Sequence, residues 1–573
     1  MQDAMKSKNL YYTLAVCAFL AVIFVFCAFR AKHGLRWSAL AYADAETLIS
    51  SRHFVNEGFK KHYFMNYHTP GYLGYTTPNI SKLGYDPHYP SLSETFDALI
   101  IRRFGENLYL LKVIAIVFSC LALLLLYGVL SHFFDRQVSA LGTAFIALSI
   151  SFLDHADAFN LYTYSETFRF AALFFFLRAE GRLKVRRIPA ASLFFLATWT
   201  VTFLEGMNSN DYIVFIQLFF FLYYFFLRHQ NKFPWGRMLF LASAPVTAGA
   251  LRIYQNILAL GGWEALMELT IRSPLSGGKT APLDKGISSF FSFWTYFART
   301  LENNMVTAHF GFGFAMVMLM AAFPLFFPKL WVDEAVRPSA QRGLTLRQTL
   351  LLLLIPSLSW WAIFPNHAAS FFWMPKHIWP VLAALFGLTL SLTWKAFAKS
   401  DSSPAFKWAA GFIVAGSLWT HAISTGKYLK EYPNPISPQT RTQMGDWGEL
   451  EQPDIIQRME VFKAAGKMTS FGDILIVHDR FDYSPSFFAY QADRRVEFAK
   501  TPAELEDQVK KLREYGREGY KKFKFFGPVK LYALARPDMN SELWKILAAR
   551  YPDRQTLPYS WVLFSLDPSS PRK

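Results

Sequence analysis

The segment from residue 42 to residue 97 opens with Tyr42-Ala43-Asp44-Ala45-Glu46 and contains, near its end, Tyr85-Asp86-Pro87-His88-Tyr89-Pro90-Ser91-Leu92-Ser93-Glu94. It is polar, aromatic and rich in Gly and Pro, and apolar stretches of membrane-spanning length lie on both sides of it. Two carboxylates so soon after an apolar stretch are costly to place unless they face water or a partner. We therefore expect the rest of the chain to hold this loop at a membrane surface.

The composition indicates a membrane protein with soluble parts. Of the 573 residues, 53% are hydrophobic and only 18% are charged, whereas soluble domains carry about 25% charged residues. Many of the Lys and Arg residues behind the net charge of +17 lie in short loops between apolar segments. Such a distribution is typical of membrane proteins and does not predict a nucleic-acid partner. The three cysteines all fall inside apolar segments, so no disulfide framework is expected.

Apolar segments near the length that a bilayer demands recur along the chain. The first, 10–29, is long for a signal peptide and no clear small-residue cleavage site follows it, so we interpret it as a retained anchor. Further spans are predicted at 108–130, 138–153, 167–177, 189–204, 212–227, 238–257, 308–327, 348–364, 377–394 and 408–424. The predicted fold is mainly α, a polytopic transmembrane helical bundle of about eleven spans, of which the weakest is 167–177 because it is short and contains Arg169.

The connecting loops predict the orientation. Loops 178–187, 228–237, 329–347 and 395–407 are strongly basic and alternate onto one side, which the positive-inside rule makes cytoplasmic. The opposite loops are poor in Lys and Arg, and they include a first outer loop at 31–106 and a second long one at 258–307. We expect an integral protein of the inner (plasma) membrane, with its N-terminus in the cytoplasm and its C-terminus outside.

The composition changes after residue 427. Residues 1–427 form the predicted transmembrane module, and 428–573 a small extracytoplasmic α/β domain with strands at 473–478, 529–535 and 561–566 and a charged helix at 502–516. No Gly-rich phosphate fingerprint follows a strand, so no nucleotide cofactor is expected.

Acidic side chains dominate the early outer loops. On a helix, Asp44 and Glu46 would diverge by roughly 200°, whereas in an extended stretch both would face one way and could share a metal or an acceptor. The alternative is a solvated helix end, or an ion pair with Arg36 or Arg52. Asp154-His155-Ala156-Asp157 offers normal ligands for a divalent cation, although helix-end polarity would explain it equally well.

On the same predicted side of the membrane, the candidate cationic residues come from later parts of the chain. Lys376 and His377 lie between Pro375 and Pro380 at the head of a span and could pair with a phosphate, although Lys376 could instead snorkel to the surface. Arg252 lies near the outer end of its span, where either role is open. Carboxylates together with isolated cations suit a reaction between a neutral nucleophile that needs a base and a leaving group with negative charge.

The order of these features resembles the GT-C superfamily of integral-membrane glycosyltransferases, which includes protein O-mannosyltransferases, lipid A aminoarabinose transferase and oligosaccharyltransferase. The likeness rests on a first span, an acidic D-x-E in the first outer loop, and then His88-Tyr89-Pro90-Ser91-Leu92 before an amphipathic segment. Members often carry a second Pro where this chain has Ser91, which leaves the exact family open.

The resemblance implies a polyprenyl-phosphate sugar donor, a lipid bilayer setting and a glycan, lipid or protein acceptor. It implies that Asp44 is the general base of an inverting transfer and that Lys376, with His377 and Arg252, binds the donor phosphate. Acceptor binding would fall to the remaining acidic and imidazole side chains: Glu46, His88, Asp154, His155 and Asp157. Some members use a metal and others do not, so a divalent cation stays open.

Two other functions compete with this one. A lipid-linked glycan transporter or polymerase would place charged residues within its spans and break helices at the membrane midplane. A non-catalytic membrane scaffold, whose working part is the C-terminal domain, would tolerate replacement of Asp44. The charged residues discussed above gather at the predicted outer ends of the spans, which favours an enzyme at the membrane surface.

Overall fold

The computed structural model describes residues 2–32, 41–60, 63–67, 85–86, 90–209, 212–228, 233–260, 343–363, 374–398, 452–470, 472–478, 485–523, 530–537 and 542–567, with isolated positions between 404 and 426. These residues fall into two compact units. Unit 1 comprises Met1–Gly34, Leu108–Ile253 and Ile271–Gln443, and unit 2 comprises Leu35–Asn107, Tyr254–Thr270 and Met444–Lys573.

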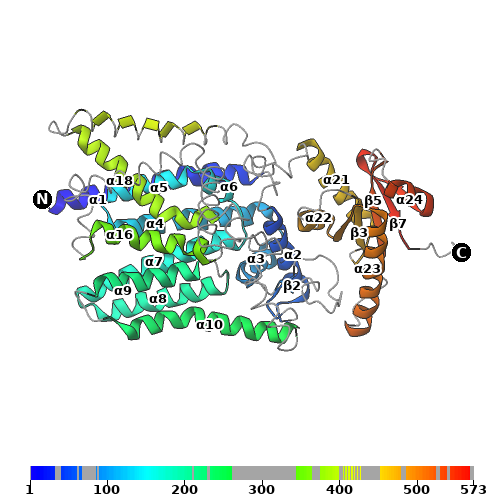
Figure 1. Ribbon diagram of the computed structural model, residues 1–573, viewed down its shortest axis with the longest axis horizontal. Helices are drawn as coiled ribbons and strands as arrows, with labels where there is room; N and C mark the ends of the chain where they lie inside the picture. The colour runs from blue at the N-terminus through cyan, green and yellow to red at the C-terminus, as the bar shows by residue number, and fades with distance from the viewer. Residues whose placement is uncertain are drawn as a thin grey trace, which may run out of the picture. The chain divides into compact units, whose positions relative to one another are not determined.

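Unit 1 is a bundle of long helices that run side by side (Figure 1). Its described helices are α1 (Gln2–Ala31), α4 (Leu108–Phe133), α5 (Arg136–Ala147), α6 (Ile150–His155), α7 (Leu161–Lys184), α8 (Ile188–Gly206), α9 (Ile213–Leu227), most of α10 (Trp235–Leu260), α16 (Leu346–Ile363), the short 3₁₀ helix η6 (Met374–Ile378) and α18 (Trp379–Ala398).

The predicted spans coincide with these helices wherever the chain is described. In that part of the chain three helices are long and apolar enough to cross a membrane, namely Leu10–Ala31, Leu108–Phe133 and Ile188–Gly206. The predicted span 138–153 is two helices, α5 and α6, because Ser149 caps α6 by accepting a hydrogen bond from the Phe152 N–H. The predicted span 308–327, and loop 258–307 beyond α10, lie outside the described residues. The total of about eleven spans and their orientation stay predictions.

Helix α18 is fixed against α5 by two glycines. A Cβ added at Gly142 would lie 2.1 Å from the Ala383 carbonyl oxygen, and one at Gly387 would lie 2.1 Å from that of Val138. Small residues let helix backbones approach this closely inside membranes. Phe145 and Phe386 stack beside the glycines with ring centroids 3.8 Å apart. This packing sets the position of α18 and of η6, which directly precedes it.

Unit 2 joins the first predicted outer loop to the C-terminal part of the chain. Helices α2 (Ala41–Glu57) and α3 (Leu92–Phe104) pack together, and strands β1 (Asn66–Tyr67) and β2 (Tyr85–Asp86) form a short antiparallel pair. The Ser51 hydroxyl donates to the Glu94 carbonyl oxygen (3.0 Å), and the Ser50 hydroxyl both donates to and accepts from the backbone of Tyr67 (3.1 Å). These bonds satisfy buried polar groups and fix α2 against α3 and β1.

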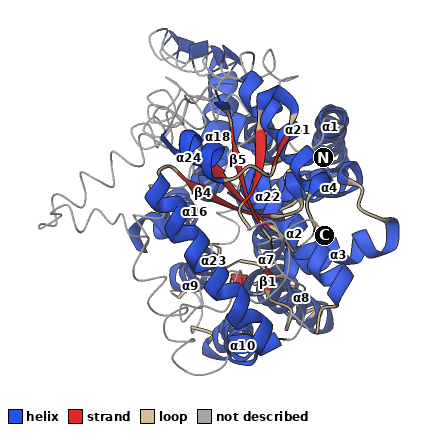
Figure 2. Ribbon diagram, turned by 90° about the vertical axis from the view of Figure 1, so that its right-hand side faces the viewer, coloured by secondary structure: helices blue, strands red, loops and turns tan. Residues whose placement is uncertain are grey.

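The C-terminal residues form the predicted α/β layer (Figure 2). A five-stranded sheet has the order β4-β3-β5-β7-β6, with β3 (Ile474–His478) parallel to β4 (Arg495–Ala499) and to β5 (Leu531–Ala535), and with β7 (Val562–Ser565) antiparallel to β5 and to β6 (Arg554–Thr556). Helices α23 (Pro502–Phe523) and α24 (Glu542–Arg550) pack their apolar residues on one face, and α21 (Gln452–Met468) and α22 (Pro485–Ala492) complete the layer.

Candidate active site

The predicted base, Asp44, lies in the first turn of α2 in unit 2 and is buried. Glu46 lies on the same helix and is partly buried. The helical one of the two expected geometries is therefore the correct one. The extended arrangement, in which both carboxylates face one way and share a metal, is wrong because successive helical residues turn by about 100°. Asp44 therefore remains a candidate for the general base without Glu46 as a partner.

Two of the predicted acceptor residues remain predictions. His88 lies outside the described residues, and only the backbone of Asp154 is described, within α6. The other two members of the Asp154–Asp157 cluster, His155 and Asp157, are both buried in unit 1.

Asp157 holds two cations. Arg30 Nη2, at the end of α1, donates to Asp157 Oδ1, and Lys112 Nζ, in the first turns of α4, lies 3.2 Å from Oδ2. All three side chains are buried, so removal of Asp157 would leave two cations in a low-dielectric site without this counter-charge. The predicted acceptor residue Asp157 is thus bound to cations of the bundle itself.

A second buried ion pair lies on α7. Arg169 Nη2 donates to Glu166 Oε2, and the Tyr212 hydroxyl donates to the other oxygen of the same carboxylate. The guanidinium also lies over the Tyr212 ring, 4.1 Å from the centroid, where the ring face attracts a cation. Arg169 Nη2 further donates to the carbonyl oxygen of Lys376 at 3.2 Å. Arg169, which weakened the predicted span, therefore holds the backbone that carries Lys376.

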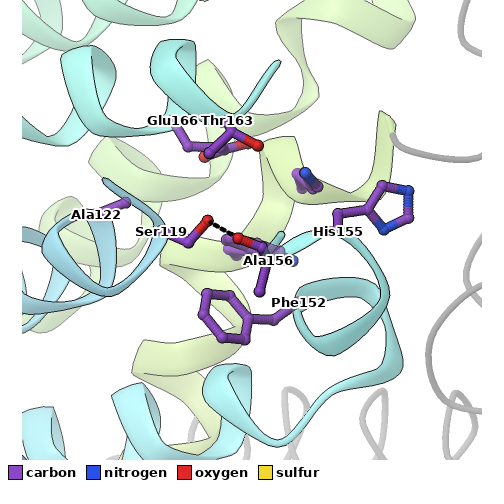
Figure 3. Close-up of a pocket in the computed structure, with 9 residues that line it drawn as sticks. Ser119, Ala122, Phe152, His155, Ala156, Thr163 and Glu166 are labelled. Atoms are coloured by element: carbon purple, nitrogen blue, oxygen red, sulfur yellow. Dashed lines mark hydrogen bonds between the residues drawn. The ribbon is translucent and has the colours of Figure 1, made fainter. Parts of the chain in front are cut away.

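Lys376 and His377 have different surroundings. Lys376 is buried and, with Trp379, lines a cavity. The other lining residues are labelled in Figure 3: Ser119, Ala122, Phe152, His155, Ala156, Thr163 and Glu166. His377 packs its ring against Tyr212, with centroids 4.4 Å apart, and stacks on Trp360 at 5.6 Å. Of the two predicted phosphate ligands, Lys376 is the one that lines the cavity.

The cavity is small and polar at several points. Its volume, about 10 Å³, is at the lower limit for holding one water molecule. The Ser119 hydroxyl in its wall donates to the Ala156 carbonyl oxygen at 3.0 Å (Figure 3), and this bond ties α4 to the turn after α6. A larger ligand group therefore needs the walls to open or to be approached from one side.

His155 is buried and lies in the wall of the same cavity. Its Nδ1 donates to the Ser151 carbonyl oxygen at 3.1 Å. The ring is thus held by the backbone of its own helix, on the wall of the cavity that Lys376 also lines.

The described side chains of this region include four cations and two carboxylates: Arg30, Lys112, Arg169 and Lys376 with Asp157 and Glu166. Buried cations favour an anionic ligand, because opposite charges attract one another more strongly in a low-dielectric site than in water. We name this group of six the basic cluster. Its chemistry suits an anionic group such as a phosphate, which accepts charge-assisted hydrogen bonds.

Arg252 lies in the second half of α10, is partly buried and does not line the cavity. Its role as a donor ligand stays a prediction. Within the residues that the structure describes, no group of three or more His, Cys, Asp or Glu side chains is placed to hold a metal ion.

Comparison with known proteins identifies the architecture. No protein-family profile matches the chain, and no curated protein matches it in sequence. A crystal structure of ArnT from Cupriavidus metallidurans bound to undecaprenyl phosphate superposes with a TM-score of 0.55 at 13% identity, over 97% of this chain and 99% of that one. An apo oligosaccharyltransferase from Archaeoglobus fulgidus gives 0.55 at 14% identity, over 93% of this chain and 70% of that one.

The chain has the GT-C fold. The resemblance deduced from the sequence is thereby confirmed at the level of fold. A second structure of the archaeal enzyme, AglB in complex with an inhibitory peptide and a dolichol-phosphate, gives a TM-score of 0.50 at 14% identity. The apolar helices of unit 1 agree with a protein that is integral to a membrane.

Sequence reasoning missed half of the basic cluster. Arg30 and Lys112 received no role, and Arg169 entered only as a weakness of a predicted span. The available signal was an ionisable residue in or at the end of an apolar segment, which is expensive there and points to function or to a partner. The expectation that charges gather at span ends fits Lys112, in the first turns of α4, but not Arg169, which lies within α7.

Proposed function

We propose that the protein is a GT-C glycosyltransferase that moves a sugar from a polyprenyl-phosphate donor to an acceptor hydroxyl at the outer face of the membrane. The observation that carries the proposal is the basic cluster, in which a buried lysine lines a cavity inside a bundle of GT-C fold. Two similar structures, of ArnT and of AglB, contain bound undecaprenyl phosphate and dolichol-phosphate respectively. Such lipids carry the kind of anion that the basic cluster suits.

The reaction is a single displacement at the anomeric carbon. The acceptor hydroxyl oxygen forms the new bond, the bond from the anomeric carbon to the phosphate oxygen breaks, and the lipid phosphate leaves with the electron pair. The hydroxyl proton passes to Asp44, which acts as general base. Attack opposite to the leaving group inverts the configuration of the sugar.

Lys376 takes the role of stabilising the departing phosphate. A fixed cation in a water-poor site stabilises charge that develops in the transition state more strongly than the same cation in water. Arg169 keeps the Lys376 backbone in place through the hydrogen bond to its carbonyl oxygen (3.2 Å). Asp157 pairs with Arg30 and Lys112, so these two buried cations keep a counter-charge while no substrate is bound.

The test is sugar transfer by purified protein in detergent with a panel of polyprenyl-phosphate sugars. The variants are Asp44→Asn, Lys376→Met and, as a control for loss of a lysine charge, Lys467→Met at an exposed position of α21. We expect Asp44→Asn to lower kcat by about 10²–10⁴ through loss of the base, and Lys376→Met to lower kcat by about 10²–10³. Lys467→Met should transfer like the native protein.

The alternatives give different results. Equal transfer by native protein and Asp44→Asn would contradict the base assignment. Native protein that transfers no sugar from any donor but moves labelled lipid-linked sugar across vesicles would support the transporter reading. Native protein that does neither, with Asp44→Asn complementing a deletion strain fully, would support the scaffold reading.

A further inference from the structure

The C-terminal α/β layer contacts the helix that carries Asp44. Within unit 2, α2 packs against α22, which is more than 400 residues away in sequence. The contact centres on Arg52, eight residues after Asp44 on the same helix. Because a helix is stiff over two turns, a restraint at Arg52 also restrains the backbone at Asp44.

Arg52 is held from several directions. Its Nε and Nη2 form paired hydrogen bonds to Glu106 Oε2 and Oε1 at 2.7 and 2.8 Å, and its Nη1 lies 3.1 Å from Asp493 Oδ1. The guanidinium lies over the Tyr490 ring, 4.5 Å from the centroid, and the Tyr490 hydroxyl donates to Glu106 Oε1 at 3.1 Å. Bidentate geometry fixes direction as well as distance. We name Arg52, Glu106, Tyr490 and Asp493 the bracket.

The C-terminal end of the bracket is itself anchored. Asp493 has a positive φ of 52°, and the neighbouring Arg494 donates to the carbonyl oxygen of Gly466 (2.7 Å) and to the Thr469 hydroxyl (3.1 Å) at the end of α21. A Cβ added at Gly466 would lie 2.0 Å from the Ala492 carbonyl oxygen, so α21 and α22 are in backbone contact. The bracket therefore joins α2 to a stiff pair of helices and not to a loose chain end.

We propose that the C-terminal α/β layer is a positioning element for the Asp44 helix, and that Arg52 is the positioning residue through which it acts. The proposal rests on the proposed function for its effect on catalysis, but the restraint itself does not. A base must be held close to its productive geometry, and a displacement of about 1 Å can cost about 10²-fold in rate.

The experiment measures hydrogen exchange of the α2 amides (41–57) and transfer kinetics of the full chain in detergent. Arg52→Met removes the charge and keeps the aliphatic stem. The matched control is Arg550→Met, which removes an arginine from an exposed pair with Glu506 (2.9 Å) elsewhere in unit 2. Arg52→Glu combined with Glu106→Arg restores an ion pair with the charges exchanged.

We expect Arg52→Met to speed exchange of the α2 amides by about 5–30-fold, the factor for 1–2 kcal/mol, and to leave exchange in β3 unchanged. The same variant, Arg52→Met, should lower kcat by about 10- to 10²-fold, with little change in the KM for the donor. The charge-exchanged pair should recover part of both effects, and Arg550→Met should show neither.

Unchanged α2 exchange in Arg52→Met would overturn the proposal, as would faster exchange with native kcat. If the native chain transfers no sugar, the proposed function fails, while the exchange measurement still decides whether the bracket restrains α2.

Discussion

The two units contain the same chemical group in different surroundings. In unit 1, Arg169 pairs with Glu166 and lies over Tyr212, whose hydroxyl donates to Glu166. In unit 2, Arg52 pairs with Glu106 and lies over Tyr490, whose hydroxyl donates to Glu106. The side chains of the first ion pair are 0% and 4% exposed, whereas those of the second are 26% and 27% exposed.

This difference in exposure changes what each group can do. A buried pair cannot regain water if one partner is lost, so it holds its geometry at a high penalty for breakage. A partly exposed pair exchanges with water and salt, so each contact contributes less, and the group works through several contacts at once. The first arrangement suits the support of a charged ligand site, and the second suits a restraint between helices that remains reversible.

The largest expected effect is on the buried pair. Arg169→Met should lower the free energy of unfolding by about 3–5 kcal/mol, because it breaks a buried ion pair by removing one partner. The double variant Arg169→Met with Glu166→Leu should recover most of the loss, since a buried ion pair replaced by apolar side chains is often neutral. Denaturant unfolding in detergent measures both. A single variant within about 1 kcal/mol of native would show that the pair is hydrated.

Removal of the tyrosine hydroxyl from each Arg–carboxylate–Tyr group should lower the free energy of unfolding by less, and by different amounts in the two units. Tyr212→Phe takes a hydrogen bond from a buried carboxylate and should cost about 1.5–3 kcal/mol, whereas Tyr490→Phe should cost less than about 1 kcal/mol because water can replace the hydroxyl at Glu106. The same unfolding measurement compares the two variants. Equal losses would mean that exposure does not separate the groups.

The smallest expected effect is a dependence of α2 amide protection on pH. Burial alone would raise the pKa of Glu106, but the hydrogen bonds and charge of Arg52 outweigh it and lower the pKa from 4.5. A carboxyl with a lowered pKa contributes stability that is present above about pH 4.5 and is lost as the pH falls through the lowered value. The α2 amides of the native protein should therefore lose protection from hydrogen exchange as the pH falls below 4.5.

Glu106→Gln is the control for that titration, because it removes the ionisable group at the bracket. The difference in α2 exchange between native protein and Glu106→Gln should shrink as the pH is lowered below 4.5. It should also shrink as salt is raised, since about 10 Å is the screening length at 0.1 M. A difference that stays constant with pH and salt would contradict a charged Arg52–Glu106 contact.

Much of the fold was predictable because it depends on local patterns. The apolar segments gave the helices of unit 1, with 108–130 found at Leu108–Phe133 and 189–204 at Ile188–Gly206. Alternating signals gave β3, β5, β7 and α23 in the C-terminal layer. Strands β4 and β6 were missed, since β4 is short and polar at alternate positions and β6 is wholly exposed.

The sequence suggested residue types for the candidate site but not which side chains pair with one another. The sequence pointed to Asp44, Asp157 and Lys376 because polar groups beside apolar segments are unusual. It did not reveal that Arg30 and Lys112 share Asp157, because these three positions lie on segments far apart in the chain. Distances between helices depend on packing, and no local pattern encodes them.

The sequence by itself determined that the chain is a helical membrane protein with an α/β end, because apolar length and alternation act residue by residue. The tertiary structure alone decided which charges neutralise one another and that α22 contacts α2. The physical reason is that burial and ion pairing depend on the three-dimensional surroundings of a side chain. The same Arg, carboxylate and Tyr are therefore a dry support beside Lys376 and a hydrated bracket on the Asp44 helix.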